Sequence, residues 1–195
     1  MQTALKSVVT FEGIGLHTGA AVTLVLRPAP ANTGIVFRRV DLPDQPMLPA
    51  IWDQIVVSPL NTRLMNADGV IVSTVEHLMA AFAGTGLHNV IVDIDGPEVP
   101  IMDGSAAAFV RTIVDTGLTR LSAPLYAIEI LRDVLVVDGA SSAKLSPATS
   151  LQIAFDIDFA DAAIGHQAKT LNMANGAFVR ELCDSRTFCR SADVD

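Results

Sequence analysis

The chain has 195 residues, of which half are hydrophobic and 17% are charged. This length suits one ordinary domain or two small ones, and the composition is that of a folded protein rather than a disordered one. Thirteen Lys and Arg residues stand against twenty-one Asp and Glu residues, which gives a net charge of −8. Because no basic run is present that would neutralise a row of phosphates, the sequence argues against nucleic acid as a partner.

The start of the chain lacks the pattern of a secretory signal peptide. Polar residues such as Lys6 and Glu12 interrupt the first twelve positions, so no unbroken apolar core forms there. No later apolar run approaches the roughly 20 residues that a helix needs to cross a bilayer. We therefore expect no transmembrane segment and a cytoplasmic location.

The first elements along the chain are predicted to be strands. Residues 22–26 place an apolar side chain at every second position, which predicts a half-buried strand that ends at the prolines of residues 28–30. Residues 35–39 have the pattern of a second strand, and the Asn-Thr-Gly turn at residues 32–34 predicts a hairpin between the two. We therefore expect the chain to open as an antiparallel meander.

A change of period indicates a helix over residues 73–83. The apolar residues that share one stripe at helical spacing are Val75, Leu78, Met79 and Phe82. Gly84 and Gly86 are expected to end this helix. Residues 89–95 return to alternation and predict a strand, which ends at the Gly-Pro pair that follows.

A second helix is expected over residues 105–116, with Gly117 just past its end. The apolar stripe of this helix consists of Phe109, Val110, Ile113 and Val114. Residues 122–124 read as a linker, and residues 126–137 and 151–159 then have strand-like patterns.

The order of these elements predicts an α+β fold. Strands, a helix, a strand and a second helix precede the linker, and strands begin again after it. We expect two similar sheet-plus-helices units, of which the second is incomplete. The expected domains are residues 1–123 and residues 124–195.

Glu76 and His77 are the most informative pair of neighbours in the sequence. Ser73 followed by Glu76 is also the signature of a capping box, so one interpretation makes Glu76 a helix cap and His77 a solvated histidine. At about 100° per residue, His77 points nearly opposite the apolar stripe and is not expected in the core. The second interpretation places the carboxylate beside a metal-bound water, where it would accept a proton. Since Ala81 stands one helical turn after His77, the H-E-x-x-H pattern is absent.

Two loops have simpler default explanations. Residues 13–19 form a glycine-rich turn between two strands, for which tight backbone geometry is the default reason. It is not a phosphate loop, because it does not lead from a strand into a helix. Residues 97–105 are interpreted as a loop and a helix cap, with Asp103 or Ser105 supplying the capping oxygen.

The remaining histidines and the cysteines show no ligand spacing. His88 and His166 stand in loop-like settings and are expected at the surface. The spacing of Cys183 and Cys189 fits neither a redox pair nor a zinc ribbon, so we expect two reduced thiols without a function.

Five segments in one order carry a resemblance to a known family. They are G-I-G-L-H-T-G at 13–19, R-P-A-P-A-N-T-G at 27–34, S-T-V-E-H-L at 73–78, I-M-D-G-S-A-A at 101–107 and S-R-T-F at 185–188. Together they closely resemble the UDP-3-O-acyl-N-acetylglucosamine deacetylases, which perform the committed step of bacterial lipid A synthesis. Several of the matches fall in loops, where packing does not dictate the sequence.

The resemblance implies a zinc-dependent hydrolase with two α+β domains and its active site between them. It implies that His77 is one of three zinc ligands and that Glu76 is the general base. Thr187 would help to polarise the amide carbonyl and stabilise the oxyanion. The residues that would lie near the substrate, an acylated UDP-sugar, are His17, Leu60, Thr62 and Phe188. The implied reaction is hydrolysis of the N-acetyl amide to a free amine and acetate.

The sequence departs from the family in the second domain. The family carries an H-K-x-x-D segment with two further zinc ligands, and a downstream histidine that acts as general acid, and neither has a counterpart before Asp195. The apolar tunnel for the acyl chain is also built largely from that later region. We therefore expect a C-terminally truncated chain with little or no activity alone. The alternative is a catalytically silent fragment that binds a sugar nucleotide or a protein partner, and the oligomeric state is not indicated.

Overall fold

The computed structural model describes residues 1–188 of the chain, and they form two compact units. The first unit contains Met1–Pro124 together with the described residues from Phe178 onward, and the second contains Leu125–Ala177. Strands and helices both contribute to the described structure, which confirms the expected α+β class. The expected division into two domains of similar layout stays a prediction.

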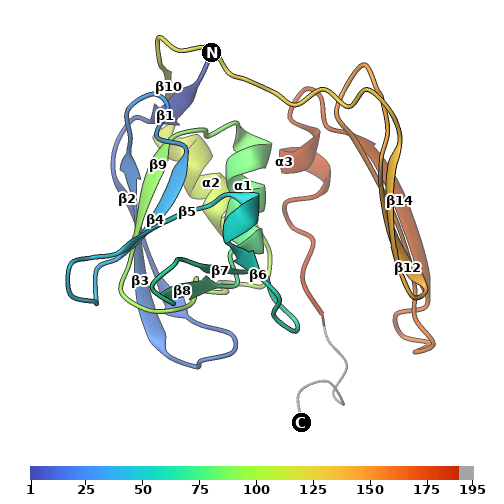
Figure 1. The fold of residues 1–195 in the computed structure, drawn as a ribbon, viewed down its shortest axis with the longest axis horizontal. Helices are drawn as coiled ribbons and strands as arrows, with labels where there is room; N and C mark the ends of the chain where they lie inside the picture. The colour runs from blue at the N-terminus through green and yellow to red at the C-terminus, as the bar shows by residue number, and fades with distance from the viewer. Residues whose placement is uncertain (189–195) are drawn as a thin grey trace. The chain divides into compact units, whose positions relative to one another are not determined.

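A five-stranded sheet is the centre of the first unit, with strand order β2-β3-β9-β4-β5 (Figure 1). Its strands are β2 (Val9–Ile14), β3 (Ala21–Pro28), β4 (Ile35–Arg39), β5 (Met47–Pro49) and β9 (Val90–Ile94). A smaller sheet has the order β6-β7-β8, from β6 (Ile55–Val56), β7 (Arg63–Met65) and β8 (Ile71–Ser73). The remaining elements are β1 (Thr3–Leu5) paired with β10 (Leu118–Arg120), the short 3-10 helix η1 (Trp52–Gln54), and the helices α1 (Glu76–Thr85) and α2 (Ala107–Thr116).

The predicted hairpin between β3 and β4 is wrong, because β9 lies between them. β9 pairs antiparallel with β3 and parallel with β4. A buried carboxylate on β9 links the three strands: Asp93 accepts hydrogen bonds from Arg27 on β3 and from Arg38 on β4, at 2.5 and 2.6 Å. The antiparallel meander is therefore limited to β2 and β3, whose side chains at Val22, Leu24 and Leu26 are buried as expected.

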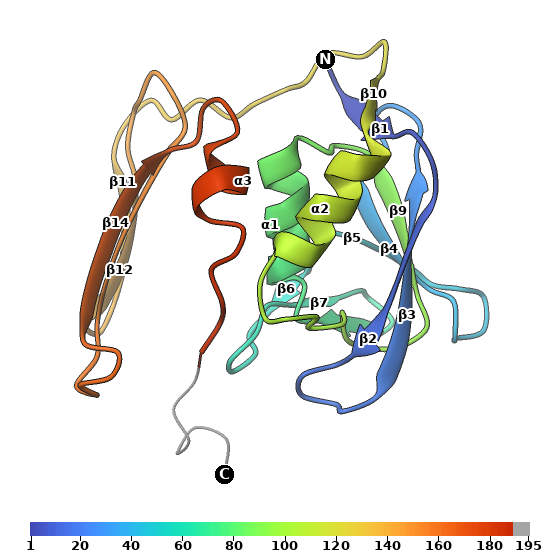
Figure 2. The ribbon, with the colours of Figure 1, turned by 180° about the vertical axis from the view of Figure 1, so that it is seen from behind.

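Both helices pack on one face of the five-stranded sheet (Figures 1 and 2). The rings of Phe11 on β2 and Phe109 on α2 meet edge to face, with centroids 5.0 Å apart. Leu78, Phe82 and Ile113 are fully buried in the same layer. Each such side chain contributes about 1.5–3 kcal/mol through removal from water. Val114 was expected in this layer, but it is 56% exposed because it lies on the outer side of α2.

The ends of helix α1 differ from the expected ones. Helix α1 begins at Glu76 rather than at Ser73, because Ser73 belongs to β8. Gly84 does not stop the helix, which continues to a left-handed residue at Gly86. Helix α2 ends at Thr116, and Gly117 lies just past its end as expected, with φ of 76°.

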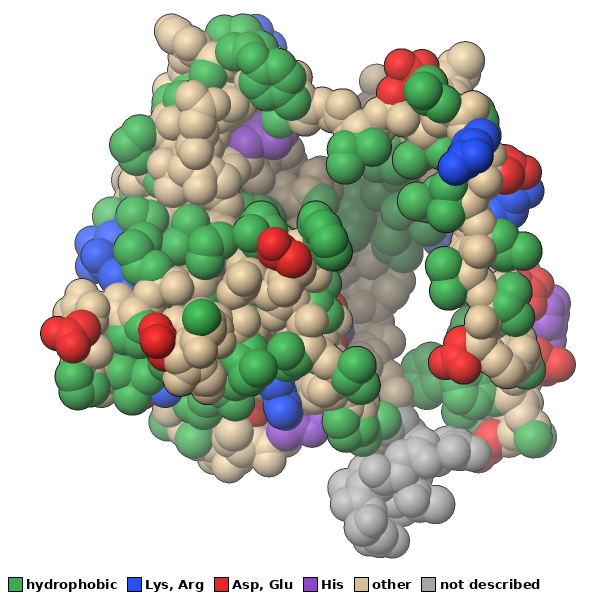
Figure 3. Space-filling model, viewed as in Figure 1, with side chains coloured by type: hydrophobic (Ala, Val, Ile, Leu, Met, Phe, Trp, Pro, Cys, Tyr) green, Lys and Arg blue, Asp and Glu red, His purple; other side chains and the backbone are tan. Residues whose placement is uncertain are grey.

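The second unit consists mainly of two antiparallel hairpins. They pair β11 (Val134–Asp138) with β12 (Ser141–Leu145), and β13 (Gln152–Asp158) with β14 (His166–Asn172). The expected strand over residues 126–137 therefore begins eight residues late. Many apolar side chains of the unit reach its surface (Figure 3), among them Val136 at 64% exposed. Helix α3 (Ala177–Glu181) follows the second hairpin and leads back to the first unit.

None of the helices within residues 1–188 has the length and apolarity that a membrane span requires.

Candidate active site

A single extended segment after β9 brings three of the sequence motifs together in the first unit. The N–H of Ser73 donates to the Pro97 carbonyl at 2.8 Å, and the N–H of Val99 donates to the Ser73 carbonyl at 3.0 Å. A little further on, the N–H of Ile101 donates to the Ile14 carbonyl at 3.0 Å. The segment thus lies between the end of β8, which leads into α1, and the end of β2, which leads into the glycine-rich loop.

Glu98 projects from this segment into the interior and is only 2% exposed. Its Oε1 accepts hydrogen bonds from the His17 N–H at 3.0 Å and from the Thr74 hydroxyl at 2.9 Å. Its Oε2 accepts from the Thr18 N–H at 2.9 Å and from the Thr18 hydroxyl at 2.8 Å. Burial raises the pKa of the Glu98 carboxyl, but these hydrogen bonds outweigh burial and leave the pKa below its ordinary value. Glu98 is therefore an ionised, fully bonded buried carboxylate.

Close packing against the Pro97–Met102 region explains two glycines of the loop at 13–19. A Cβ atom on Gly15 would lie 2.5 Å from Oε2 of Glu98 and against the Thr18 hydroxyl. A Cβ atom on Gly13 would lie 2.8 Å from Cβ of Pro100. Among the three glycines of this loop, only Gly19 has a left-handed φ, of 64°. The default explanation by backbone geometry therefore holds for Gly19, whereas Gly13 and Gly15 permit close approach.

The turn that leads into α1 is strained at Thr74. Its φ is 57°, which a β-branched residue rarely adopts. Such a conformation costs on the order of 1–3 kcal/mol and persists only where surrounding contacts hold it. Here Thr74 is 2% exposed and its hydroxyl donates to Glu98. Two residues later the chain presents Glu76.

Glu76 is the first residue of α1, and its carboxylate binds a neighbouring loop rather than capping the helix. Its Oε2 accepts a hydrogen bond from the N–H of Thr62 at 3.1 Å, while the Thr62 carbonyl accepts from the N–H of Val75 at 3.4 Å. The capping-box interpretation is wrong, because α1 has no side-chain cap and the Ser73 hydroxyl accepts from Arg63 instead. Glu76 and Thr62, both predicted site residues, are thus in direct contact.

His77 follows Glu76 on the half-buried surface of the same helical turn. It lies outside the core, as its position opposite the apolar stripe predicts. Within residues 1–188 its imidazole forms no hydrogen bond or ion pair.

No group of three His, Cys, Asp or Glu side chains among the described residues is arranged to hold a metal ion. The described residues fit a zinc ion only in part, because His77 is a suitable ligand and a protein zinc site needs three or four.

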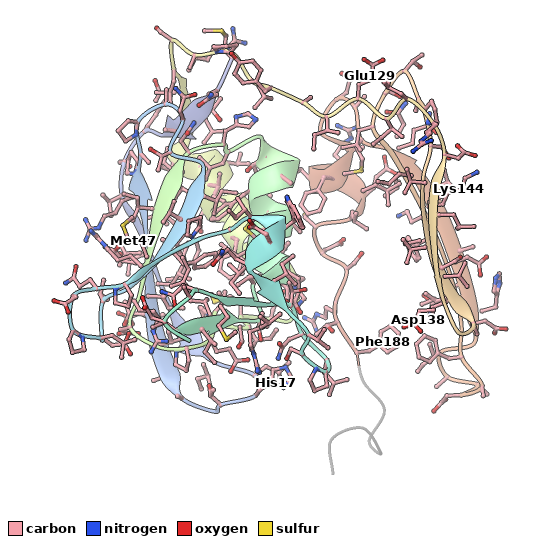
Figure 4. All side chains as sticks on the ribbon, viewed as in Figure 1. His17, Met47, Glu129, Asp138, Lys144 and Phe188 are labelled. Atoms are coloured by element: carbon pink, nitrogen blue, oxygen red, sulfur yellow. The ribbon has the colours of Figure 1, made fainter. Side chains whose placement is uncertain are left out.

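His17 and Leu60 lie on exposed loops of the first unit. His17 follows β2 in the loop held by Glu98 (Figure 4), and its side chain is exposed. Leu60 is 63% exposed and has a left-handed φ of 63°. A bulky residue in that conformation is strained, as is common where a loop has a functional constraint.

The segment that carries Thr187 and Phe188 returns to the first unit. The N–H of Thr187 donates to the carbonyl of Gly104 at 2.9 Å. Next to it, Arg186 lies 3.9 Å from Asp103, whose pKa is lowered mainly by a hydrogen bond from the Ser105 hydroxyl. Phe188 is half exposed at the end of the described residues (Figure 4). The structure therefore connects Thr187 to the loop before α2. In that loop the Ser105 hydroxyl accepts the Ala107 N–H, but the N-cap residue of α2 is Ala106 and has no side-chain cap, so the expected capping by Asp103 or Ser105 is wrong.

His88 was expected at the surface, and its side chain is partly exposed there. It is half-buried, its Nδ1 lies 2.8 Å from the Thr3 hydroxyl, and burial lowers its pKa. His166 is exposed beside Asp156, as expected. Cys183 is a free, half-buried thiol whose pKa is raised by burial, and Cys189 lies outside the described residues.

Glu98 is the site residue that the sequence interpretation missed. Its neighbours Pro97 and Pro100 made the segment read as an ordinary loop. The available signal was a carboxylate in a mostly apolar stretch beside a buried strand, because a carboxylate is rarely buried unless it is bonded.

The fold and these contacts define an α+β protein with a carboxylate and an imidazole side by side at a helix start, surrounded by loops. The family model described as "LpxC: UDP-3-O-acyl N-acetylglycosamine deacetylase" matches residues 2–195. The chain therefore belongs to this family.

Curated relatives carry the name UDP-3-O-acyl-N-acetylglucosamine deacetylase. The protein from Photobacterium profundum is 42% identical over 196 residues, which cover 100% of this chain and 64% of the relative. The protein from Myxococcus xanthus is 46% identical over 194 residues, which cover 100% and 62%. The protein from Phenylobacterium zucineum is 47% identical over 188 residues, which cover 96% and 64%. The chain thus spans less than two thirds of the length of these relatives.

Proposed function

We propose that this chain supplies the general base and one zinc ligand of a deacetylase that hydrolyses the N-acetyl amide of a UDP-3-O-(3-hydroxyacyl)-N-acetylglucosamine. The products are the free amine and acetate, and the reaction is the committed step of lipid A synthesis. The observation that carries the proposal is the pair at the start of α1: Glu76 oriented by the Thr62 N–H, beside an imidazole of His77 that no described group engages.

The family and the names of its curated relatives support the deacetylase over a silent binding fragment. A substrate of the acylated UDP-sugar class follows from those same names. The location in the cytoplasm remains a prediction from the sequence.

A zinc ion fits this proposal as a group that the described residues hold only in part. His77 would be one ligand, and the others would come from outside residues 1–188. When bound, zinc lowers the pKa of its water to about 7 and polarises a carbonyl oxygen.

Glu76 is proposed as the general base. The hydrogen bond from Thr62 restrains one of its two carboxylate oxygens, and within residues 1–188 the other oxygen accepts no hydrogen bond and would take the proton. The half-buried position of Glu76 at the start of α1 keeps it accessible to water and substrate.

Thr187 is proposed to donate its hydroxyl to the carbonyl oxygen of the amide as negative charge develops there. Its backbone is held by Gly104, and its side chain is exposed rather than engaged in the core. His17, Leu60, Thr62 and Phe188 are proposed to contact the substrate. Three of them lie on loops adjoining β2 and β7, and their side chains are exposed or half-buried.

A fusion protein provides the test. The 195-residue chain is followed by the part of the Photobacterium profundum relative that the match does not cover, and acetate release from the acylated UDP-sugar is measured with and without zinc. We expect turnover that a chelator abolishes and zinc restores, and that His77→Ala removes. A fusion protein that is folded and binds zinc but releases no acetate would overturn the proposal.

A further inference from the structure

Two of the motifs around the candidate site share one buried carboxylate. The loop at 13–19 carries His17, and the turn before α1 presents Glu76 and His77. The backbone of residues 97–101 forms hydrogen bonds to both regions, to Ser73 before the turn and to Ile14 in the loop. Glu98 lies within this segment. The side chain of Glu98 then bonds to each region directly.

Within residues 1–188, the donors to Glu98 are all uncharged. They are two backbone N–H groups, of His17 and Thr18, and two hydroxyl groups, of Thr18 and Thr74. Hydrogen bonds to an ionised acceptor are shorter and about twice as strong as neutral ones. A buried carboxylate without a cationic partner depends on all of these donors, so each bonded segment constrains the position of the others.

The strained turn at Thr74 is one end of this arrangement. Its left-handed conformation needs contacts that hold it, and the bond from its hydroxyl to Oε1 is the polar contact that its side chain makes. The loop of His17 is the other end. Gly15 lies so close to Glu98 that only a glycine leaves room for the carboxylate, so loop and carboxylate fit closely.

We propose that Glu98 is a positioning residue that couples the His17 loop to the Thr74 turn, so that His17, Glu76 and His77 keep one mutual arrangement. Glu98 does not touch the reacting atoms. It acts through two backbone segments, and the catalytic consequence of this coupling rests on the function proposed above.

Amide hydrogen exchange in the 195-residue chain tests the coupling without any assay of activity. Glu98→Gln keeps the shape of the side chain but turns one acceptor oxygen into a donor that faces other donors. We expect exchange to accelerate about tenfold or more both at residues 15–19 and at residues 73–76, while β3 and β9 stay protected. Glu12→Gln, the same change at an exposed carboxylate on β2 next to the loop, should leave both segments unchanged.

A second variant keeps the test decisive if Glu98→Gln does not fold. Thr74→Val removes a single donor to Oε1 and keeps the branched shape at that strained position. We expect it to loosen residues 73–76 and, through the shared carboxylate, also residues 15–19. Loosening of one segment alone, in either variant, would overturn the coupling.

Kinetics of the fusion protein test the catalytic consequence. Glu98→Gln is expected to lower kcat per bound zinc about tenfold or more while KM changes less than about threefold. A purely structural role would reduce the amount of folded, zinc-loaded protein without changing kcat per zinc, and that result would overturn the positioning role. Absence of turnover in the unsubstituted fusion protein would instead overturn the proposed function, and the exchange result would still decide the coupling.

Discussion

The backbone N–H of Thr62 donates to the carboxylate of Glu76 at 3.1 Å, which joins the loop before β7 to the first residue of α1. This bond gives Glu76 an orientation before any substrate arrives. It makes the carboxylate an anchor for the loop, in addition to its proposed role as a proton acceptor.

Glu76→Gln is predicted to separate these roles. Its amide oxygen can still accept from Thr62, but it cannot act as a base, so turnover of the fusion protein should fall about 100-fold or more with zinc content unchanged. Hydrogen exchange at Thr62 should stay as in the unsubstituted protein. Glu76→Ala should lower turnover equally and also accelerate exchange at Thr62. Loss of zinc with unchanged turnover per zinc would mean that Glu76 is structural.

Gly15→Ala is predicted to destabilise the first unit by about 1–3 kcal/mol, as overpacking usually does. The added methyl group would lie 2.5 Å from Oε2 of Glu98, where neither partner can withdraw without loss of a hydrogen bond. Urea denaturation measures the change. Gly96→Ala is the matched control, because its methyl group would meet only Val22 at ordinary contact distance, 3.4 Å. Equal stability of the two variants would contradict the close fit of loop and carboxylate.

Gly84→Ala is predicted to destabilise the docking of α3 although alanine favours a helix by about 1 kcal/mol over glycine. A Cβ atom there would overlap the ring of Phe178, with Cε1 only 2.6 Å away. The variant should accelerate exchange at Leu182 and Cys183, whose N–H groups bond to the Phe178 carbonyl.

The double variant Gly84→Ala, Phe178→Ala provides the control for this contact. With the ring removed, Gly84→Ala should become neutral or stabilising, which a double-mutant cycle measures as a coupling free energy of about 1 kcal/mol or more. Additive effects of the two substitutions would mean that Phe178 does not pack on Gly84.

The pH dependence of stability should report the buried carboxylate of Glu98. Its pKa is lowered in the folded protein and is about 4.3 in an unfolded chain. Its contribution to the free energy of unfolding is therefore fully present above about pH 4.3 and is lost as the pH falls through the lower, folded pKa. Urea midpoints between pH 7 and pH 3 should fall less steeply for Glu98→Gln than for the unsubstituted chain. Parallel curves would contradict an ionised Glu98.

The sequence predicted the positions of the strands along the chain better than it predicted which strands pair. The strand over residues 35–39 and the alternation of residues 22–26 follow from local pattern, and both are present. That β9 separates them does not follow from local pattern, because β9 comes from a distant part of the chain and pairs with both strands, with Asp93 bonded to Arg27 and Arg38. Pairing between segments that are distant in the sequence cannot be predicted from hydrophobic periodicity, which indicates only local secondary structure.

In the candidate site, too, local pattern predicted some residues and missed those whose role depends on distant contacts. His77 was placed outside the core by helical geometry alone, which is confirmed. Gly84 looked like a helix stop, and only the position of Phe178, far along the chain, explains a glycine inside α1. Glu98 was missed because its four donors come from two separate segments.

The 195-residue chain without the added part of the relative is predicted to have little or no deacetylase activity. The physical reason is the ligand count, because one histidine does not hold zinc with useful affinity. Acetate release by the purified chain is the measurement. Robust turnover that a chelator and His77→Ala both abolish would show that the chain completes a zinc site by itself.

Anomalous X-ray scattering at the zinc absorption edge, from crystals of the zinc-loaded fusion protein, tests the central claim most directly. We predict one strong peak at about 2.0–2.1 Å from a ring nitrogen of His77, with the carboxylate of Glu76 facing it. A zinc peak elsewhere, with His77 free of metal, would contradict the role of this helix start as part of a deacetylase site.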